Sequence, residues 1–412
     1  MFEKFRKMIG PGVVTGASDD DPSGIATYTQ AGAAFGFQFL WTAIITYPLM
    51  VTIQEMCARI GIVTRQGLTG ILKRYYPRPV MWLMMLFSFP AIILNISADL
   101  AGMGAVGHML VPAIPSFAFA MFFCLLLLFN LIRLSYRKIA NILQFLCLVL
   151  LCYMIVPFLS RQNWGEILTN TFLPQIVLNR NFFALLVAIL GTTISPYLFF
   201  WQTSMEVEEV EEKKIFVNKI MIHEMGTDVR FGIFFSNTIF YFIILAAGTE
   251  LHNRGITEVY TVDQAALALR PLAGEASYFL FAFGVLGTGL LAIPVLAGSL
   301  SYIVSEAFGW SEGLNKTFHQ AKGFYIVMGI SMICALAFNL IGINPIKILV
   351  YTAILYGLTA PVLIGMIIHI CNNKKIMGSY TNSRVSNILG FITLLVMIAA
   401  GIVLIWQTAI GD

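Results

Sequence analysis

Three consecutive acids, Asp19, Asp20 and Asp21, stand inside an otherwise apolar run near the start of the chain, and Pro22 follows them directly. A charge at the centre of a bilayer costs about 2.5–3.5 kcal/mol even on the gentlest scale. Proline removes a backbone donor and clashes with the preceding helical turn. We therefore expect a helix break at Asp21-Pro22 that frees backbone carbonyls beside a carboxylate. Hard divalent cations prefer such oxygen ligands.

A second interruption lies in GTTISPYLFFWQ, residues 191–202, where polar Thr192, Thr193 and Ser195 precede Pro196. A proline in a membrane helix often only kinks it, so Pro196 alone leaves a kink and a site equally open. Two discontinuous helices at corresponding positions of two halves instead point to the binding site of an inverted-repeat transporter.

The composition requires a membrane environment. The chain has 412 residues, of which 58% are hydrophobic and 11% charged, with a mean hydropathy of +0.83. A soluble domain carries about 25% charged residues, so these charges are too few for a soluble surface. Apolar runs of roughly 20 residues predict membrane-spanning helices. We predict eleven spans, at 8–34, 37–58, 79–105, 115–132, 139–160, 182–207, 230–249, 275–304, 322–342, 346–370 and 386–408.

The basic residues predict the orientation of these spans. With the N-terminus in the cytoplasm, about four in five of the 25 Lys and Arg residues fall in cytoplasmic segments, as the positive-inside rule requires. An odd number of spans then places the C-terminus outside. We expect a multi-pass protein of the cell (plasma) membrane in contact with lipid. The basic residues are scattered over the loops as topology predicts, so we expect no nucleic-acid partner.

Four segments resemble the Nramp family of divalent-metal transporters. They are the sixth-span break, ADLAGMG of the third span, MVTIQEMCARIGIVT of the second, and GPGVVTGASDDDPSGIATYTQAGAAFGFQFLW of the first. The resemblance implies an all-α integral membrane protein with a LeuT-like fold and alternating access, its first and sixth helices broken. Residues 1–412 would form a single transporter domain, with inverted five-helix repeats at 8–160 and 182–370 and an additional C-terminal helix at 386–408. The family mostly carries Mn²⁺ or Fe²⁺ with protons.

The sequence departs from the family at the ion site. The family's Asp-Pro-Gly-Asn reads Asp21-Pro22-Ser23-Gly24, so the acid matches and the Asn ligand is replaced by Gly24. The family's Met-Pro-His reads Ser195-Pro196-Tyr197, and a second sixth-span His falls on Gln202.

The third and tenth spans depart from the family as well. Asp99 matches a third-span Asp, whereas Gly102 stands where the family has Glu. A tenth-span Gln of the family falls on Ala353.

These departures favour a harder cargo. A thioether suits transition metals and not Mg²⁺, whereas Ser195 offers a hard oxygen. The change to Gly24 removes a ligand and should open space for an ion that keeps several waters, as Mg²⁺ does. Losing both histidines and the Glu removes groups that relay protons. The pattern looks like the Nramp-related magnesium transporter branch, with Mg²⁺ and Mn²⁺ as transported substrates, little proton coupling and no resident cofactor.

The predicted metal site has few side chains. The Asp21 carboxylate, the Ser195 hydroxyl, and backbone carbonyls near Ser18 and Thr192 are the candidate ligands, beside the space at Gly24. We expect a second set to line the path or support the site: Tyr197, Gln54, Asp20, Asp19, Asp99 and Gln202.

Each residue of the second set has an ordinary structural alternative. Asp19 and Asp20 would then cap the broken helix or face water. Gln54 would make an interhelical hydrogen bond, and Asp99 would be a buried acid paired with Arg59. We expect the run EVEEVEEKK, residues 206–214, to be a solvated continuation of the sixth helix, and the aromatic stretch 199–201 to contact lipid or pack internally.

Other functions stay open from the sequence. A proton-coupled Mn²⁺/Fe²⁺ symporter of the Nramp type is the nearest alternative. A sodium-coupled organic-solute transporter would share the fold, but such sites normally meet a substrate carboxylate with backbone donors, which three acids disfavour. An intramembrane aspartyl protease needs two acids sharing a proton; Asp21 and Asp99 are available, yet no GxGD motif occurs. We expect a monomeric transporter, not an enzyme.

Overall fold

The computed structural model describes residues 10–133, 148–160, 162–214 and 217–410. Within them the chain is helical and contains no strand. The predicted positions 8–9 and 139–147 lie outside the described residues. Eight segments are long and apolar enough to cross a membrane, and each remaining predicted span coincides with shorter or less apolar helices.

The helices follow the predicted order of spans. The first span consists of α2 (Pro11–Asp19) and α3 (Pro22–Phe35), and the sixth of α11 (Arg180–Thr193) and α12 (Pro196–Lys213). The other spans are α4 (Leu40–Thr64), α6 (Arg78–Leu110), α7 (Ser116–Arg133), α9 (Cys152–Leu159) with the turn η1 (Leu148–Leu151), α13 (Lys219–Glu250), α16 (Ser277–Phe308), α17 (Lys322–Phe338), α18 (Pro345–Asn372) and α20 (Arg384–Ile410).

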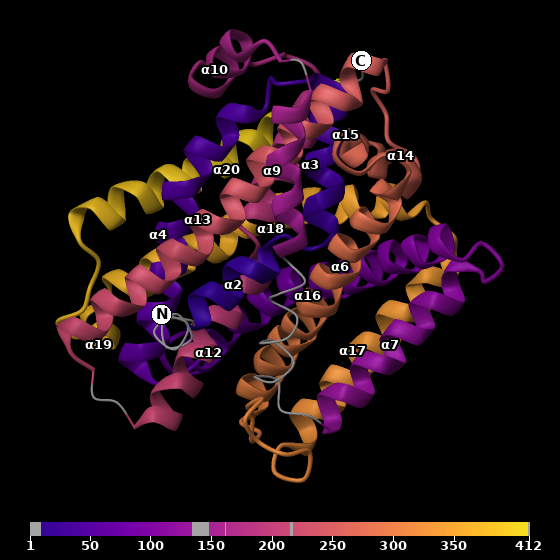
Figure 1. The fold of residues 1–412 in the computed structure, drawn as a ribbon. Coiled ribbons are helices and arrows are strands. Elements are labelled where there is room, and N and C mark those ends of the chain that lie inside the picture. Colours follow the sequence, from indigo (N-terminus) through magenta and orange to yellow (C-terminus); the bar gives the residue numbers. More distant parts are fainter. Residues whose placement is uncertain (1–9, 134–147, 161, 215–216, 411–412) are drawn as a thin grey trace.

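Short connecting helices lie at the two ends of the bundle and were not predicted. They are α5 (Leu68–Tyr75), α10 (Trp164–Phe172), α14 (Val262–Ala266), α15 (Arg270–Ala273) and α19 (Lys374–Met377), with the 3₁₀ turns η2 (His252–Arg254), η3 (Leu267–Leu269), η4 (Gly274–Ala276) and η5 (Asn339–Ile341). Figure 1 shows α10, α14 and α15 at one end, and α19 with the last turns of α12 at the other. The α19 end carries Lys213, Lys374 and Lys375, as the predicted cytoplasmic side requires.

Glycines allow the broken helices to approach their neighbours closely. A Cβ on Gly16 of α2 would lie 2.2 Å from the Gly232 carbonyl oxygen of α13, and one on Gly191 of α11 would lie 2.1 Å from the Ala353 carbonyl oxygen of α18. Small residues at such crossings are typical of membrane helix packing. The first half of each broken span is therefore seated against one long, continuous helix.

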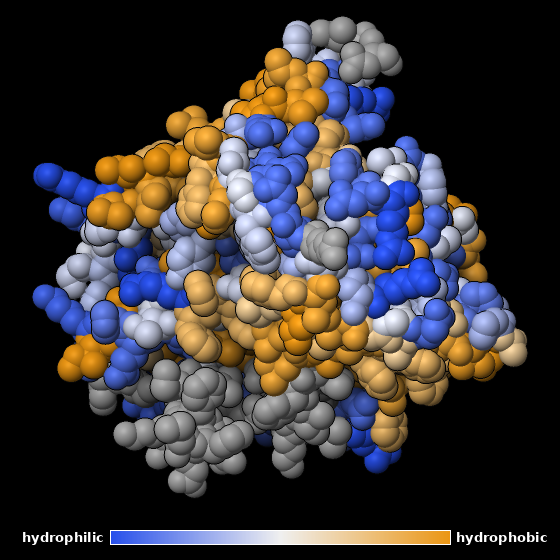
Figure 2. All heavy atoms as spheres, turned by 45° about the horizontal axis from the view of Figure 1, so that its top comes forward, coloured by the Kyte–Doolittle hydropathy of each residue, from blue (hydrophilic) through white to orange (hydrophobic). Residues whose placement is uncertain are grey.

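The bundle exposes apolar side chains on its outer helices. Phe122 on α7, Ile330 on α17 and Ile405 on α20 are each more than half exposed, and α7 and α17 lie side by side at one edge (Figure 1). In Figure 2 hydrophilic residues gather over the middle of the face turned forward, between broad hydrophobic areas. By contrast Phe199, Phe200 and Trp201 are buried, so this aromatic stretch packs internally and does not face lipid.

Candidate metal site

The first break places a carboxylate at the start of α3. Asp21 is the N-cap residue: its Oδ1 accepts a hydrogen bond from the Gly24 amide at 2.7 Å, and Pro22 occupies the first helical position. Its Oδ2 accepts a hydrogen bond from Asn95 Nδ2 of α6 at 2.8 Å. Asp21 is only 2% exposed. The sequence therefore places a carboxyl group inside the bundle, where the helix is interrupted.

Asn95 belongs to this site and was missed from the sequence. It lies one helical turn before Asp99, and its Nδ2 is also 3.4 Å from Asp99 Oδ2. Its carbonyl oxygen Oδ1 is buried and has no hydrogen-bond partner in the described residues. The available signal was a carboxamide four residues before an acid in an apolar helix, since such positions share one face. Asn95 thus joins Asp21 and Asp99 and holds an unused acceptor beside them.

Asp99 is buried, as its structural alternative predicted, but the predicted pairing with Arg59 was wrong. Arg59 donates to the side chain of Asn382, in the loop before α20, whereas Asp99 lies in the interior of α6 at 0% exposure. The two residues do not pair because they lie at different positions along the bundle: Arg59 is in the last turns of α4. Asp99 Oδ1 has no hydrogen-bond partner in the described part of the chain.

Asp19 and Asp20 are buried between α2 and α13. Each is 1% exposed, and the Ser236 hydroxyl of α13 lies 2.9 Å from Asp19 Oδ2 and 3.2 Å from Asp20 Oδ1. The expectation that they face water is therefore wrong, because the close crossing of α2 and α13 covers them. Asp20 does occupy the C-cap position of α2.

At the second break the polar side chain stabilises the helix before the proline, α11, and not the helix after it. Ser195 precedes α12 but makes no side-chain cap to it. Its hydroxyl instead donates back to α11, to the carbonyl oxygens of Thr192 at 2.6 Å and Gly191 at 3.2 Å. The Ser18 carbonyl at the first break accepts from the Tyr197 hydroxyl at 3.0 Å. Both predicted carbonyl ligands already accept one hydrogen bond, and each keeps a second lone pair.

Gly24 opens less space than predicted. A Cβ built there would lie 3.2 Å from Tyr28 Cε2 and 3.3 Å from Thr192 Oγ1, which is tighter than ordinary contact. The reason is that α3 and α11 converge at the breaks, so neighbouring side chains occupy the room that a lost Asn would vacate. The convergence brings Thr192 of the second break beside Gly24 of the first.

Two predicted path residues lie in the interior. Tyr197 packs against Tyr356 of α18 with ring centroids 5.8 Å apart. Gln54 is 0% exposed, and neither atom of its amide has a hydrogen-bond partner among the described residues. The proposed interhelical hydrogen bond of Gln54 is therefore not observed, and its place along a path stays a prediction.

The start of α2 is fastened to α13. Asp228 accepts hydrogen bonds from the backbone amides of Gly10 at 2.9 Å and Gly12 at 2.7 Å. These amides belong to the first turn of the helix, where no intrahelical partner exists, and a carboxylate there is also favoured by the helix dipole. One acid of α13 thus holds the start of α2, the helix that leads to the first break.

Gln202 fastens α2 to α12 as well. Its carbonyl oxygen accepts from the Thr15 hydroxyl, and its Nε2 donates to Glu206 at 2.8 Å. The sixth helix continues through this region to Lys213, as predicted. The expectation that this continuation is solvated is wrong for Glu206, which is 3% exposed, because α12 here packs against α2 and α4.

The opposite end is covered by an extended segment. The Gln30 side chain of α3 donates to the Thr257 carbonyl at 3.1 Å and accepts from the Val259 amide at 2.8 Å. A cavity of about 350 Å³ lies beside this segment, between α3, α11 and α18. Side-chain hydrogen bonds thus hold neighbouring elements together on both sides of the breaks, through Asp228 and Gln202 on one side and Gln30 on the other.

Comparison with known proteins identifies the family. The model of the family "Natural resistance-associated macrophage protein-like", Nramp, matches residues 12–407. The chain belongs to the Nramp family. The Mg²⁺-related branch of this family is not distinguished by the match.

Solved Nramp-type structures share the fold. The Eremococcus coleocola manganese transporter, in complex with an aromatic bis-isothiourea substituted compound, is similar with a TM-score of 0.76 at 17% identity, covering 96% of this chain and 85% of that one. The inward-facing conformation of Mhp1 is similar with a TM-score of 0.53 at 12% identity, covering 97% and 91%. At these identities the likeness concerns the LeuT-like, multi-pass membrane fold alone.

If Asp228 holds the start of α2, its removal should speed hydrogen exchange in this helix. In Asp228→Ala the first-turn amides of α2 lose their acceptor, so we expect faster hydrogen exchange of a peptide covering residues 10–19, by about tenfold for a loss of about 1.4 kcal/mol. The measurement is hydrogen–deuterium exchange with mass spectrometry on the purified chain. Glu224→Ala, an exposed acid one turn earlier on α13, is the control and should leave this peptide unchanged. Equal exchange in both variants would contradict the role of Asp228.

Proposed function

We propose that this Nramp protein is a secondary transporter that moves divalent metal ions by alternating access. The observation that carries the proposal is Asp21, a buried carboxylate at a helix break, beside the unpartnered carboxamide oxygen of Asn95. A buried charge without an ion partner is costly, and a divalent cation would neutralise it. The likeness in fold to the Eremococcus coleocola manganese transporter supports the same class of cargo.

The oxygen donors at the breaks favour Mg²⁺ and Mn²⁺ as partly hydrated ions. Within the described residues no three His, Cys, Asp or Glu side chains converge on one metal position, so a single carboxylate would act with neutral oxygens. Asn95 Oδ1, with the Ser195 hydroxyl and the second lone pairs of the Ser18 and Thr192 carbonyls, would supply them. Few protein ligands leave several waters on the ion, which suits the reluctance of Mg²⁺ to dehydrate.

Proton coupling should be weak. The family's sixth-span histidines are replaced by Tyr197 and Gln202. Gln202 holds α2 to α12 through its amide, a role that involves no proton transfer. The alternative is the proton-coupled Mn²⁺/Fe²⁺ symport described for the family, and the transport assay below separates the two.

Alternating access would break, in turn, the side-chain hydrogen bonds that hold the helices together at the two ends of the break region. Release of α2 from Asp228 and Gln202 would open the break region on the side of α19, which we assign to the cytoplasm from its lysines. Release of the Gln30 contacts would open the other side. The two inverted repeats predicted at 8–160 and 182–370 would move against each other in this scheme.

Uptake into proteoliposomes tests the function. We expect Mn²⁺ uptake that excess Mg²⁺ suppresses, with little change of an internal pH dye. Asp21→Asn should abolish uptake while preserving folding, because Asn caps a helix as well as Asp; Asp263→Asn, an exposed acid on α14, is the control. Mn²⁺ uptake insensitive to Mg²⁺ and accompanied by acidification would instead support the proton-coupled alternative, and full activity of Asp21→Asn would refute the proposed site.

The Asn95 contact predicts a change in affinity. Asn95→Leu keeps the side-chain size but removes a hydrogen bond to a charged group, worth about 1.5–3 kcal/mol. We expect the KM for Mn²⁺ uptake to rise about ten- to a hundredfold. Ser97→Ala is the matched control, since Ser97 lies on the same helix but contacts Asn339; its KM should not change. An unchanged KM for Asn95→Leu would remove Asn95 from the site.

A further inference from the structure

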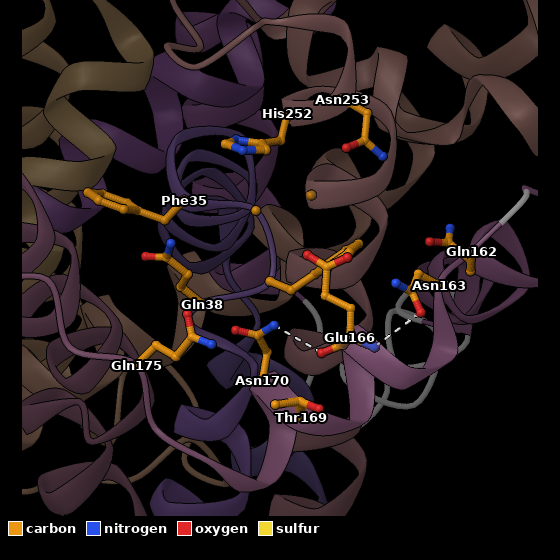
Figure 3. Close-up of a pocket in the computed structure, with 13 residues that line it drawn as sticks. Phe35, Gln38, Gln162, Asn163, Glu166, Thr169, Asn170, Gln175, His252 and Asn253 are labelled. Atoms are coloured by element: carbon orange, nitrogen blue, oxygen red, sulfur yellow. Dashed lines mark hydrogen bonds between the residues drawn. The ribbon is translucent and has the colours of Figure 1, made fainter.

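A second cavity, with a polar lining, lies at the C-terminal end of α3, away from the two helix breaks. Its volume is about 510 Å³, and it is formed where residues 35–38 at the end of α3, residues 162–175 around α10, and residues 248–253 at the end of α13 meet. Figure 3 shows this pocket with its lining side chains. None of the residues assigned to the break site lines it, so it is a separate feature of the α10 end of the bundle.

The lining of this cavity has the electrostatics of a cation site. It contains one acid, Glu166, and no Lys or Arg. His252 Nδ1 lies 2.8 Å from the Ala33 carbonyl oxygen. A carbonyl only accepts, so Nδ1 carries the proton and a neutral ring leaves Nε2 as an acceptor. The remaining polar lining is mostly side-chain carboxamides, whose oxygens suit hard cations.

Acceptors in the cavity are left without partners. Asn170 is 6% exposed, and its Oδ1 is buried with no hydrogen-bond partner in the described residues; the same holds for Gln38 Oε1. The Glu166 carboxylate makes no hydrogen bond or ion pair to any described residue, although its backbone accepts from Asn170 Nδ2 at 2.9 Å. Figure 3 shows the Glu166 side chain pointing into the middle of the pocket. Glu166 itself is exposed. The two buried carboxamide oxygens, of Asn170 and Gln38, are acceptors that normally find a donor or a cation.

The size of the cavity indicates a hydrated ion. A water molecule occupies about 30 Å³ of liquid volume, so about 510 Å³ accommodates an ion with its first shell of waters. Mg²⁺ usually keeps several waters and binds through one or two carboxylates. Glu166 would supply the charge, and the oxygens of Gln38 and Asn170 would accept hydrogen bonds from ion-bound water.

We propose that Glu166, Gln38 and Asn170 form a second divalent-cation site that holds a hydrated Mg²⁺ or Mn²⁺ at the α10 end of the bundle. Binding there does not depend on the ion at Asp21. The site goes beyond the proposed transport function and rests on it only for the identity of the available ion.

Mn²⁺ binding to the purified full-length chain tests this site. Electron paramagnetic resonance counts free Mn²⁺ and therefore the number bound per chain. We expect two bound ions in the unchanged protein, one in Glu166→Gln, one in Asp21→Asn and none in the double variant, with Mg²⁺ displacing both. Gln38→Met should weaken the Glu166 site about two- to tenfold, the loss of a neutral hydrogen bond. Glu275→Gln, an exposed acid near the same end, should bind two.

The outcomes separate this site from the one at Asp21. If Glu166→Gln binds as many ions as the unchanged protein, the second site is overturned, whatever happens at Asp21. If the chain binds a single ion that Glu166→Gln removes and Asp21→Asn retains, the second site stands and the proposed break site fails.

Discussion

The structure depends on how one buried carboxylate is satisfied at an interrupted helix. Asp21 caps α3 through the Gly24 amide and accepts from Asn95 of α6. The cap removes an orphan backbone donor in the middle of an apolar bundle, where no water replaces it. The same carboxyl group lies at the point where the two helices of the first span separate. The stability of the break, and the cation affinity that we propose, would therefore depend on a single side chain.

At the second break the polar groups of the interrupted helix are satisfied differently. Ser195 directs its hydroxyl back to the end of α11 and leaves the start of α12 without a side-chain cap. The second break therefore contributes neutral polar groups, whereas the first contributes a carboxyl group. This asymmetry suits a cation held mainly by one acid and otherwise by weak, exchangeable contacts, which an ion must have if it is to leave again.

Much of this arrangement follows from the sequence, and the rest required packing. Pro22 and Pro196 identify the breaks only together with the polar residues that precede them, because Pro48, Pro90 and Pro361 lie inside continuous helices. Asn95 was missed because a lone carboxamide in an apolar helix gives no indication of which neighbour it faces. The burial of Asp19, Asp20 and Glu206 was missed for the same reason: α13 covers the two acids and α12 packs against α2 and α4, and neither crossing is encoded in local pattern. The Gly24 space was overestimated because Tyr28 and Thr192 approach it from other turns.

The central claim is that a divalent ion binds between the two breaks at Asp21. Anomalous scattering from Mn²⁺-soaked crystals, repeated with Mg²⁺ as competitor, tests it most directly. The account predicts an anomalous peak beside the Asp21 carboxylate and the Ser195 hydroxyl that weakens as Mg²⁺ is added. Mn²⁺ peaks elsewhere with none at Asp21, or a peak there that Mg²⁺ does not weaken, would contradict it.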